Sequence, residues 1–286
     1  MGSAPNFVAY RGTYGAGRPE AIASLKLPPA KASLLQGTRP RKVWRYVAIH
    51  AESLQICAAK ISIGPLDHVF WAVWDRETQT LHEGKHNWDR GVEMPDGRLL
   101  IHDKGIEAEF DLAEVAGIET VTPVGNSWTW TRKQGGINAT GHVRLNGKDI
   151  QISAPAIIDD SAGFHARRTD WRWCSGVGTN TAGQAVAWNF VNGINDDPAG
   201  SEQTVWVDGV AYAVDPLLIA TDLSHVRFAD QSQLDFHQES VRGHRQNLVL
   251  LKSQYSQPFG TFSGDLPHAG QLKSGLGVME SHSALW

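Results

Sequence analysis

The feature that most constrains the fold is a succession of short segments, rich in β-branched and aromatic residues and bounded by Gly, Asn, Asp or Pro. Examples are VWRYVAIHA at 43–51, HVFWAVWD at 68–75, SWTWTR at 127–132 and AVAWNFVN at 185–192. They recur at intervals of about 8 to 15 residues, a spacing typical of β-barrels and sandwiches. LNGKD at 145–149 and VDGVA at 207–211 are typical of tight hairpins. The sequence therefore predicts an all-β chain.

Helical periodicity is scarce, and only 111–118 and 231–245 are candidates for short helices. The order of segments in 44–77, an aromatic strand followed by a turn and then a Trp-rich strand, returns in 171–197. We therefore expect two barrels in tandem. The predicted divisions are an irregular lead-in at 1–40, a first barrel domain at 41–150 and a second at 151–286.

Charge and hydropathy narrow the classes of partner. The formal net charge is −4 over 286 residues, which gives no electrostatic reason to expect nucleic acid or an anionic membrane. No apolar run approaches the roughly 20 residues that span a bilayer, so no transmembrane segment is expected. The first residues lack the pattern of an export signal. The two cysteines, Cys57 and Cys174, lie in separate strand-like runs. We expect buried, reduced cysteines and a cytoplasmic location.

Tryptophan is unusually abundant, with eleven residues in the chain. Trp128 and Trp130, like Trp171 and Trp173, are two residues apart and would share one face of a strand. Such pairs fill β cores, and they also line cavities, where an indole stacks on extended ligands and stabilises cations. The total favours an aromatic-lined cavity in addition to a core.

Several segments together resemble a known family. They are RKVWRYVAIHA, GPLDHVFWAVWDRE, DDSAGFHARRTDWRWCSGVG, AVAWNFVNGINDDPAGSEQTVWVDG and QPFGTFSGDL with GLGVMESHSALW. From about Arg39 to Trp286 the chain is similar to an uncharacterised bacterial domain family placed beside the AttH-like proteins and the carotenoid 1,2-hydratases, in the calycin (lipocalin-like) group. The resemblance implies two tandem lipocalin-like β-barrels with a hydrophobic ligand in or between them. Relatives of this fold add water to isoprenoid double bonds or cyclise polyenes, but no functional residue is carried over from them.

The stretch DDSAGFHARRTDWRW at 159–173 contains the strongest candidate for chemistry. Asp159 and Asp160 are adjacent and would face opposite sides of a strand, so only one can enter a cavity. After a turn at SAG, His165 and the indoles of Trp171 and Trp173 can converge on that carboxyl. Burial among indoles would raise its pKa, so that it could protonate an alkene or carbonyl. His165 would position water or act as the base.

A structural role for the same residues is open. An aspartate here can cap the turn or pair with Arg167 or Arg168, and thereby join the two halves of the chain. His165 can equally be a packed histidine. The sequence does not choose between these roles, and it leaves open which aspartate faces the cavity.

A second set of residues would bind the ligand. In 185–197, Trp188 and Asn192 share one strand face and Asn189 lies on the other, so indole and amide groups could contact a ligand. The alternative is a turn at the end of the strand. The matching segment of the first half offers Trp71 and Trp74.

The remaining histidines give no metal site. His50 interrupts an apolar strand and either faces the cavity or is a satisfied core residue. His82 and His86 would lie about 13 Å apart on a strand, too far to share a metal. No nucleotide or metal motif is present, so we expect neither cofactor nor metal.

The sequence predicts an enzyme that needs no cofactor and performs acid–base chemistry on a hydrophobic, unsaturated small molecule such as a terpenoid, steroid or polyketide. Hydration, dehydration, isomerisation and cyclisation all suit it. The alternative is a non-catalytic carrier or sensor of a hydrophobic ligand. The sequence does not indicate the oligomeric state.

Overall fold

The computed structural model describes residues 7–88, 90–247 and 252–285. Strands account for 66% of the described residues and helix for 1%. The single helix, α1, is one turn long (Glu20–Ala23), and a two-stranded ribbon is formed by β2 (Leu35–Gln36) and β3 (Arg39–Pro40). The predicted all-β chain with two barrel-like halves is confirmed.

The first sheet has eleven strands. They are β1 (Tyr10–Thr13), β4 (Lys42–His50), β5 (Leu54–Ile63), β6 (Leu66–Asp75), β7 (Thr80–Asn87), β8 (Val92–Glu93), β9 (Arg98–Asp103), β10 (Ile106–Leu112), β11 (Ile118–Val124), β12 (Ser127–Leu145) and β13 (Lys148–Gly163).

The second sheet has nine strands. They are β14 (Arg168–Asn180), β15 (Ala185–Asn192), β16 (Thr204–Val207), β17 (Val210–Ala213), β18 (Leu218–Ile219), β19 (His225–Arg227), β20 (Gln233–Asn247), β21 (Lys252–Leu266) and β22 (Gly270–Leu285).

The two sheets share one topology. The order is β7-β6-β5-β4-β13-β12-β10-β9-β8 in the first and β17-β16-β15-β14-β22-β21-β20-β19-β18 in the second. In each half an antiparallel meander curls until its first long strand pairs with its last, β4 with β13 and β14 with β22. Each of the nine strands along the path of one sheet therefore has a counterpart in the other, whereas β1 and β11 lie off this path in the first sheet.

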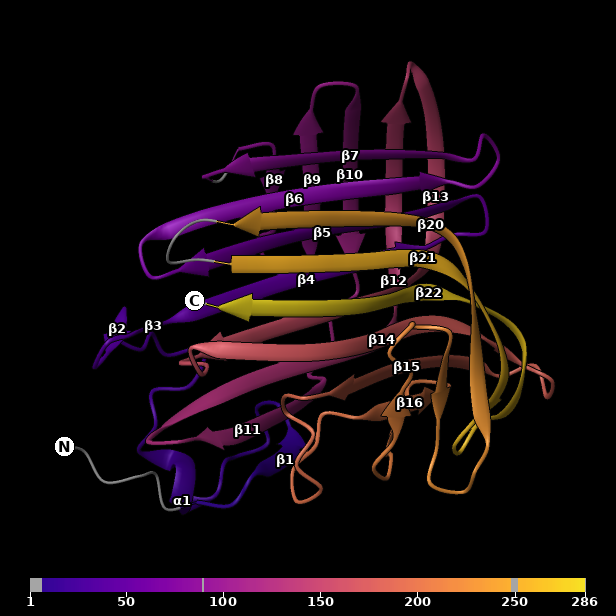
Figure 1. The fold of residues 1–286 in the computed structure, drawn as a ribbon. Helices are drawn as coiled ribbons and strands as arrows, with labels where there is room; N and C mark the ends of the chain where they lie inside the picture. Colours follow the sequence, from indigo (N-terminus) through magenta and orange to yellow (C-terminus); the bar gives the residue numbers. More distant parts are fainter. Residues whose placement is uncertain (1–6, 89, 248–251, 286) are drawn as a thin grey trace.

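Three hydrophobic clusters hold this arrangement together. One fills the first barrel around Val47, Ile49 and Phe110, and another fills the second around Trp188 and Phe190. The third lies between the sheets, where the opposite faces of β4–β6 meet those of β14, β15, β21 and β22. Figure 1 shows β20–β22, in gold to yellow, in front of the purple strands β4–β6 and running in nearly the same direction.

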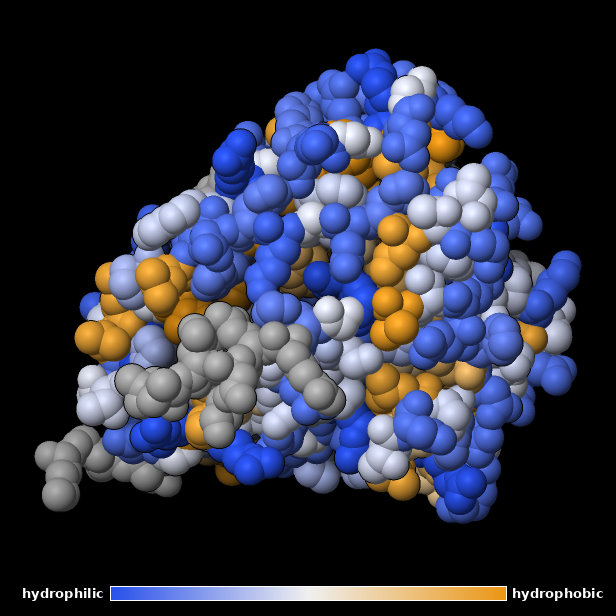
Figure 2. Space-filling view, turned by 45° about the horizontal axis from the view of Figure 1, so that its top comes forward, coloured by the Kyte–Doolittle hydropathy of each residue, from blue (hydrophilic) through white to orange (hydrophobic). Residues whose placement is uncertain are grey.

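Alternation along β4 explains how one strand serves two clusters. Val47 and Ile49 point into the first barrel, whereas Tyr46 and Ala48 point toward the second sheet. Successive strand residues face opposite sides, so a strand buried on both faces is continuously apolar. The outer face seen in Figure 2 is mostly hydrophilic, and its hydrophobic residues form separate patches.

The lead-in packs against the first barrel. Ile22 and Leu27 are buried with Trp128 and Trp130, so these two indoles belong to a core. Residues 1–6 of the predicted lead-in lie outside the described residues. The chain passes from the first sheet to the second between Gly163 and Arg168, beyond the predicted boundary at 150, and a division into independently folding domains stays a prediction.

Three local predictions are wrong. The candidate helix at 231–245 is largely β20, because buried Leu234 and half-buried Phe236 alternate with exposed Asp235 and His237, in the two-residue period of a strand. The candidate at 111–118 contains the end of β10 and the start of β11. The turn expected at 161–163 is the extended end of β13, which pairs with β12 and β4.

Candidate active site

A cleft lies between the two sheets, beside the hydrophobic cluster that joins them. Its water-accessible volume is about 80 Å³. Its walls are mainly aromatic and aliphatic, and its polar groups come from both halves of the chain. The lining residues that bear on chemistry are Lys42, Trp44, Tyr46, Lys133, Asp159, His165, Trp171, Trp173, Glu202 and Glu280. Apolar walls with a few converging polar groups are typical of a small-molecule site.

The two halves contribute equivalent pieces to this cleft. A Trp-Arg-aromatic segment occurs in β4, with Trp44 and Tyr46, and again in β14, with Trp171 and Trp173. The last strand of each half places a carboxyl directly opposite the second aromatic residue, Asp159 opposite Tyr46 and Glu280 opposite Trp173. Both carboxyls line the cleft, and the negative charge of Asp159 acts on Glu280.

Glu280 is a buried carboxyl surrounded by neutral hydrogen-bond donors. Its Oε1 accepts a bond from Trp171 Nε1 at 2.7 Å, and its Oε2 accepts bonds from the Tyr255 hydroxyl at 2.9 Å and Gln257 Nε2 at 3.3 Å. The residue is 6% exposed. Burial raises the pKa of Glu280 to about 7, although these donors oppose the rise. A substantial fraction of Glu280 is therefore protonated near neutral pH.

Asp159 has a different environment. Lys133 Nζ lies 2.5 Å from Asp159 Oδ2 and 3.0 Å from Glu202 Oε1, and the side chains of Lys133 and Glu202 are almost completely buried. Burial opposes the charge on Lys133, but the two carboxylates raise its pKa above the ordinary value. Among the described residues, Asp159 Oδ1 has no hydrogen-bond partner.

The environments of Asp159 and Glu280 differ because corresponding positions in the two halves hold different residues. Lys133 on β12 is directly opposite Asp159 in the ladder, whereas on the corresponding strand β21 the neighbour of Glu280 is Gln257. A lysine favours the carboxylate form, and a neutral amide does so far less. The cleft therefore combines a protonatable carboxyl with an ion-paired carboxylate, a division that separates acid from base.

His165 and Lys42 also line the cleft. Burial, with a smaller contribution from nearby Lys42, lowers the pKa of His165 to about 3, so His165 is a neutral imidazole. Among the described residues its Nδ1 has no hydrogen-bond partner. Burial also lowers the pKa of Lys42 to about 7, with a contribution from Arg39. His165 can accept a proton or orient water.

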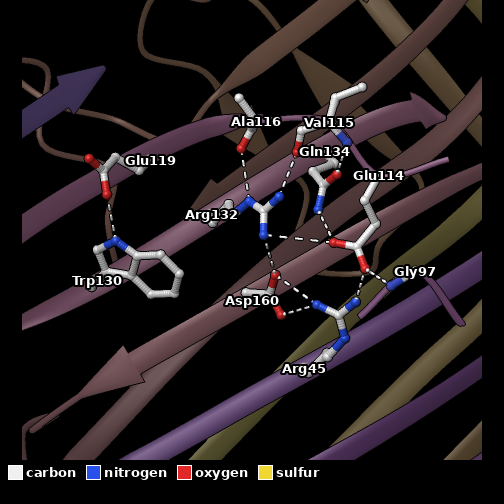
Figure 3. Close-up of polar contacts among 10 residues, drawn as sticks. All are labelled: Arg45, Gly97, Glu114, Val115, Ala116, Glu119, Trp130, Arg132, Gln134 and Asp160. Carbon is white, nitrogen blue, oxygen red and sulfur yellow. Dashed lines mark hydrogen bonds and ion pairs between the residues drawn. The ribbon is translucent and has the colours of Figure 1, made fainter. Parts of the chain in front are cut away.

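Asp160, the other aspartate of the pair, lies outside this cleft. Figure 3 shows its carboxylate between Arg45 and Arg132, in a network that includes Glu114. Arg45 Nη1 donates to Asp160 Oδ1 at 2.9 Å and to Oδ2 at 3.1 Å, and Arg132 Nη1 lies 3.9 Å from Oδ2. Burial raises the pKa of Asp160, and the ion pair with Arg45 opposes that rise.

These contacts correct one expectation. Asp160 pairs with arginines of β4 and β12, whereas Arg167 is exposed and Arg168 pairs with Asp170. The ladder places Arg45 and Arg132 opposite Asp160, so strand pairing selects the partners. A catalytic role for Asp160 stays a prediction, and its contacts favour a structural role.

We expect Asp160→Asn to lower the free energy of unfolding by about 1–3 kcal/mol, because charged hydrogen bonds to Arg45 become neutral ones. Urea denaturation at pH 7 measures the change. Asp111→Asn is the matched control, since Asp111 is 84% exposed and should change stability by less than about 0.5 kcal/mol. A stable variant with greatly reduced turnover would contradict the structural role.

The ligand-binding residues predicted in the first half are dispersed. Trp71 packs inside the first barrel and donates to Asp103, whereas Trp74, three residues on, lies between the sheets and donates to Glu239. His50 is buried, and its Nδ1 lies 3.0 Å from Gln55 Oε1. It lines a different pocket from that of Glu280. Burial lowers the pKa of His50 to about 4.

The predicted residues of the second half are mostly structural in their contacts. Trp188 is completely buried inside the second barrel. Asn192 binds the backbone of Leu217 and Ile219. Asn189 accepts a bond from Trp173 Nε1 at 2.8 Å and thereby holds one wall of the cleft. Their binding roles stay predictions, and Asn189 supports the site through Trp173.

One group of potential metal ligands occurs among the described residues, His102, Glu107 and Glu109. It lies on the β9–β10 hairpin, where Arg144 and Arg98 already pair with the two glutamates. Ion pairing explains this group, and the expectation of no metal stays a prediction. No helix in the described part of the chain is long and apolar enough to cross a membrane.

Sequence reasoning missed Glu280, Lys133 and Tyr46. The signal that was available is the repeated Trp-Arg-aromatic segment at 44–46 and 171–173. The partners of these segments lie more than 100 residues further along the chain, so nothing local to Glu280 marks it.

A family model described as a domain of unknown function, DUF2804, matches residues 85–286. A search of curated proteins gave no match.

Among solved structures, kievitone hydratase from Nectria haematococca is 10% identical with a TM-score of 0.54, over 84% of this chain and 88% of that one. An AttH-like protein from Nitrosomonas europaea is 13% identical (TM-score 0.43, covering 88% and 99%). CghA with Sch210972 is 10% identical (TM-score 0.40, covering 97% of each). The likeness to kievitone hydratase shows a shared fold, and the family resemblance predicted from the sequence is confirmed.

Proposed function

This chain belongs to the DUF2804 domain family, and we propose that it is an acid–base enzyme acting on a hydrophobic, unsaturated small molecule such as a terpenoid, steroid or polyketide. One observation carries the proposal. Glu280 is a buried carboxyl with a pKa of about 7, held by three neutral donors in an aromatic cleft that also contains the carboxylate of Asp159. A carrier needs shape and a neutral hydrogen bond, but it has no use for this pair.

The proposed reaction begins with proton transfer from Glu280 to one carbon of a double bond. The π electrons form the new C–H bond, and the other carbon becomes a cation that the faces of Trp171 and Trp173 stabilise. Trp171 Nε1 and the Tyr255 hydroxyl, already bonded to Glu280, stabilise the carboxylate that remains.

The cation then has two fates. In hydration, water adds to it and loses a proton to the open Oδ1 of Asp159. In isomerisation or cyclisation, a carbon next to the cation loses the proton to the same base. In each case Asp159 ends protonated and Glu280 ionised, and exchange with solvent restores both.

Incubation in D2O with prenylated phenols and isoprenoid alkenes tests the class of reaction. Because Glu280 exchanges its proton with solvent, each product should carry one carbon-bound deuterium, measured by mass spectrometry. In H2¹⁸O, a hydration product should also gain one ¹⁸O. Heat-denatured protein is the control.

The rival function predicts a different result. If compounds of this panel quench the tryptophan fluorescence of the folded protein but acquire neither deuterium nor ¹⁸O, the protein is a carrier or sensor and the enzymatic proposal fails.

A further inference from the structure

We propose that the substrate carries an oxyanion, a carboxylate or a phosphate, and that Arg242 binds it at the far end of the cleft. This inference rests on the proposed function for the identity of the reacting end, but its test depends on binding alone. It assigns a substrate class, amphipathic acids, to a site that was defined above only by its apolar walls.

The anion site lies in a pocket that adjoins the cleft of Glu280. The two share Trp44, Ile61 and Ile63 in their walls. The second pocket has a water-accessible volume of about 120 Å³, and Tyr255, a hydrogen-bond partner of Glu280, also lines it. Its cationic and imidazole groups are His68, Lys85, Arg242, His244 and His282.

Arg242 is buried with its charge incompletely neutralised. Its side chain is 8% exposed, and among the described residues its ion-pair partner is Glu83, which is 48% exposed and 3.5 Å away. Its guanidinium carbon lies 3.8 Å from the ring centroid of Phe70 and 5.4 Å from that of Tyr255. Within the described part of the chain, Nη1 has no hydrogen-bond partner.

A buried guanidinium with an unpaired N–H donor is well suited to receive an anion. Desolvation of an arginine is unfavourable unless its donors are satisfied, and a planar guanidinium binds carboxylate or phosphate oxygens in pairs. Glu83 is too exposed to compensate Arg242 fully. Two aromatic rings hold the guanidinium in place, and Lys85 adds a second cation at the same pocket.

The strand register relates this anion site to Glu280. Arg242 on β20 is opposite Gln257 on β21, and Gln257 donates to Glu280 on β22. Two strand spacings separate the backbones of Arg242 and Glu280, roughly 10 Å. The expected substrate therefore has its oxyanion roughly that far from the double bond that receives the proton.

Titrations of tryptophan fluorescence with farnesoic acid, farnesyl phosphate and farnesol test the inference. The wild type should bind at least one of the two anions about 10- to 100-fold more tightly than the alcohol, because a hydrogen bond to a charged group contributes that much. The better of the two anions distinguishes carboxylate from phosphate.

Arg242→Gln should remove this preference and leave farnesol affinity unchanged, which also shows that the variant is folded. Arg242→Lys should retain part of the preference. Arg144→Gln, at an exposed arginine paired with Glu107, is the matched control and should bind all three compounds as the wild type does.

Three outcomes overturn the inference. They are equal affinities of the wild type for the alcohol and both anions, an equal loss of all three in Arg242→Gln, and a preference that survives this change. The test is separable from the proposed function, since Glu280→Gln should keep the preference for the anion. An inactive protein that loses anion preference in Arg242→Gln would be a carrier of acids.

Discussion

Glu280→Gln is expected to lower turnover by about 10²–10⁴-fold, the usual contribution of general acid catalysis. Glutamine keeps the size of the side chain and one of the two acceptor oxygens, but it has no acidic proton. Because the walls of the cleft are unchanged, affinity for a hydrophobic ligand should change little, and the loss should fall on kcat. Deuterium incorporation from D2O measures it, with Glu109→Gln on the surface hairpin as the matched control.

The pH profile provides a second readout of the same group. Since the protonated form of Glu280 acts, wild-type turnover should fall as pH rises through about 7. The titratable and charged groups that act on Glu280 are Tyr255, Asp159 and Arg242, and burial is the largest influence. Turnover that increases from pH 6 to pH 8, or a Glu280→Gln variant within threefold of the wild type, would refute this assignment.

Measuring the stability of Glu280→Gln shows whether a loss of turnover comes from lost chemistry or from unfolding. The pKa of Glu280 is about 7 in the folded protein, against an ordinary 4.5. The protonated form of Glu280 therefore contributes to the free energy of unfolding in full below pH 4.5. This contribution is lost as the pH rises through about 7, a change of about 3 kcal/mol. Glutamine does not titrate. Relative to the wild type, Glu280→Gln should be more stable at pH 8 than at pH 5, as measured by urea denaturation.

Lys133→Met should have the largest effect on stability, a loss of about 3–5 kcal/mol at pH 8. Lys133 compensates two carboxylates, Asp159 at 2.5 Å and Glu202 at 3.0 Å, and Glu202 is almost completely buried. Removing one member of a buried ion cluster leaves the remaining charges without compensation. This destabilises a protein much more than replacing the whole cluster with apolar residues does. Urea denaturation with fluorescence detection measures the change.

Acid should partly restore the Lys133→Met protein, because burial raises the pKa of Glu202 and its protonation removes the repulsion from Asp159. Adding Glu202→Gln to it should recover stability in the same way at pH 8. Lys148→Met, at an exposed lysine, is the control and should be within about 0.5 kcal/mol of the wild type. A Lys133→Met variant as stable as this control would show that the cluster is not ionised as described.

The all-β fold was predictable because its signals are local. Alternation such as that of Tyr46 and Val47, and turn residues such as Asn146 and Gly147, act within a few positions. The duplicated topology was visible only in outline, since equivalent strands share one Trp-Arg-aromatic segment. The wrong helix at 231–245 arose because Leu234 and Val241 are also seven residues apart, a spacing that fits both a helical face and a bulged strand.

The site was predictable only in part, for a physical reason. Asp159, His165, Trp171 and Trp173 are close in sequence, and the structure brings all four into one cleft. The role of each carboxyl depends on its neighbour across the ladder, however, and those partners come from distant strands. Whether an aspartate faces Lys133 or Arg45 is a property of register, which one-dimensional patterns do not specify.

Pairing of the first long strand of each half with its last makes folding depend on events late along the chain. The hydrogen bond between Trp171 and Glu280 spans 109 residues, and that between Arg45 and Asp160 spans 115. Chains with such high contact order fold slowly, and until β13 and β22 dock, β4 and β14 present unpaired edges that invite aggregation. Because Glu280 lies on β22, its carboxyl reaches the cleft only when β22 docks and completes the second barrel. Variants that stall before this step should therefore be degraded or aggregate, rather than persist as partly active enzyme.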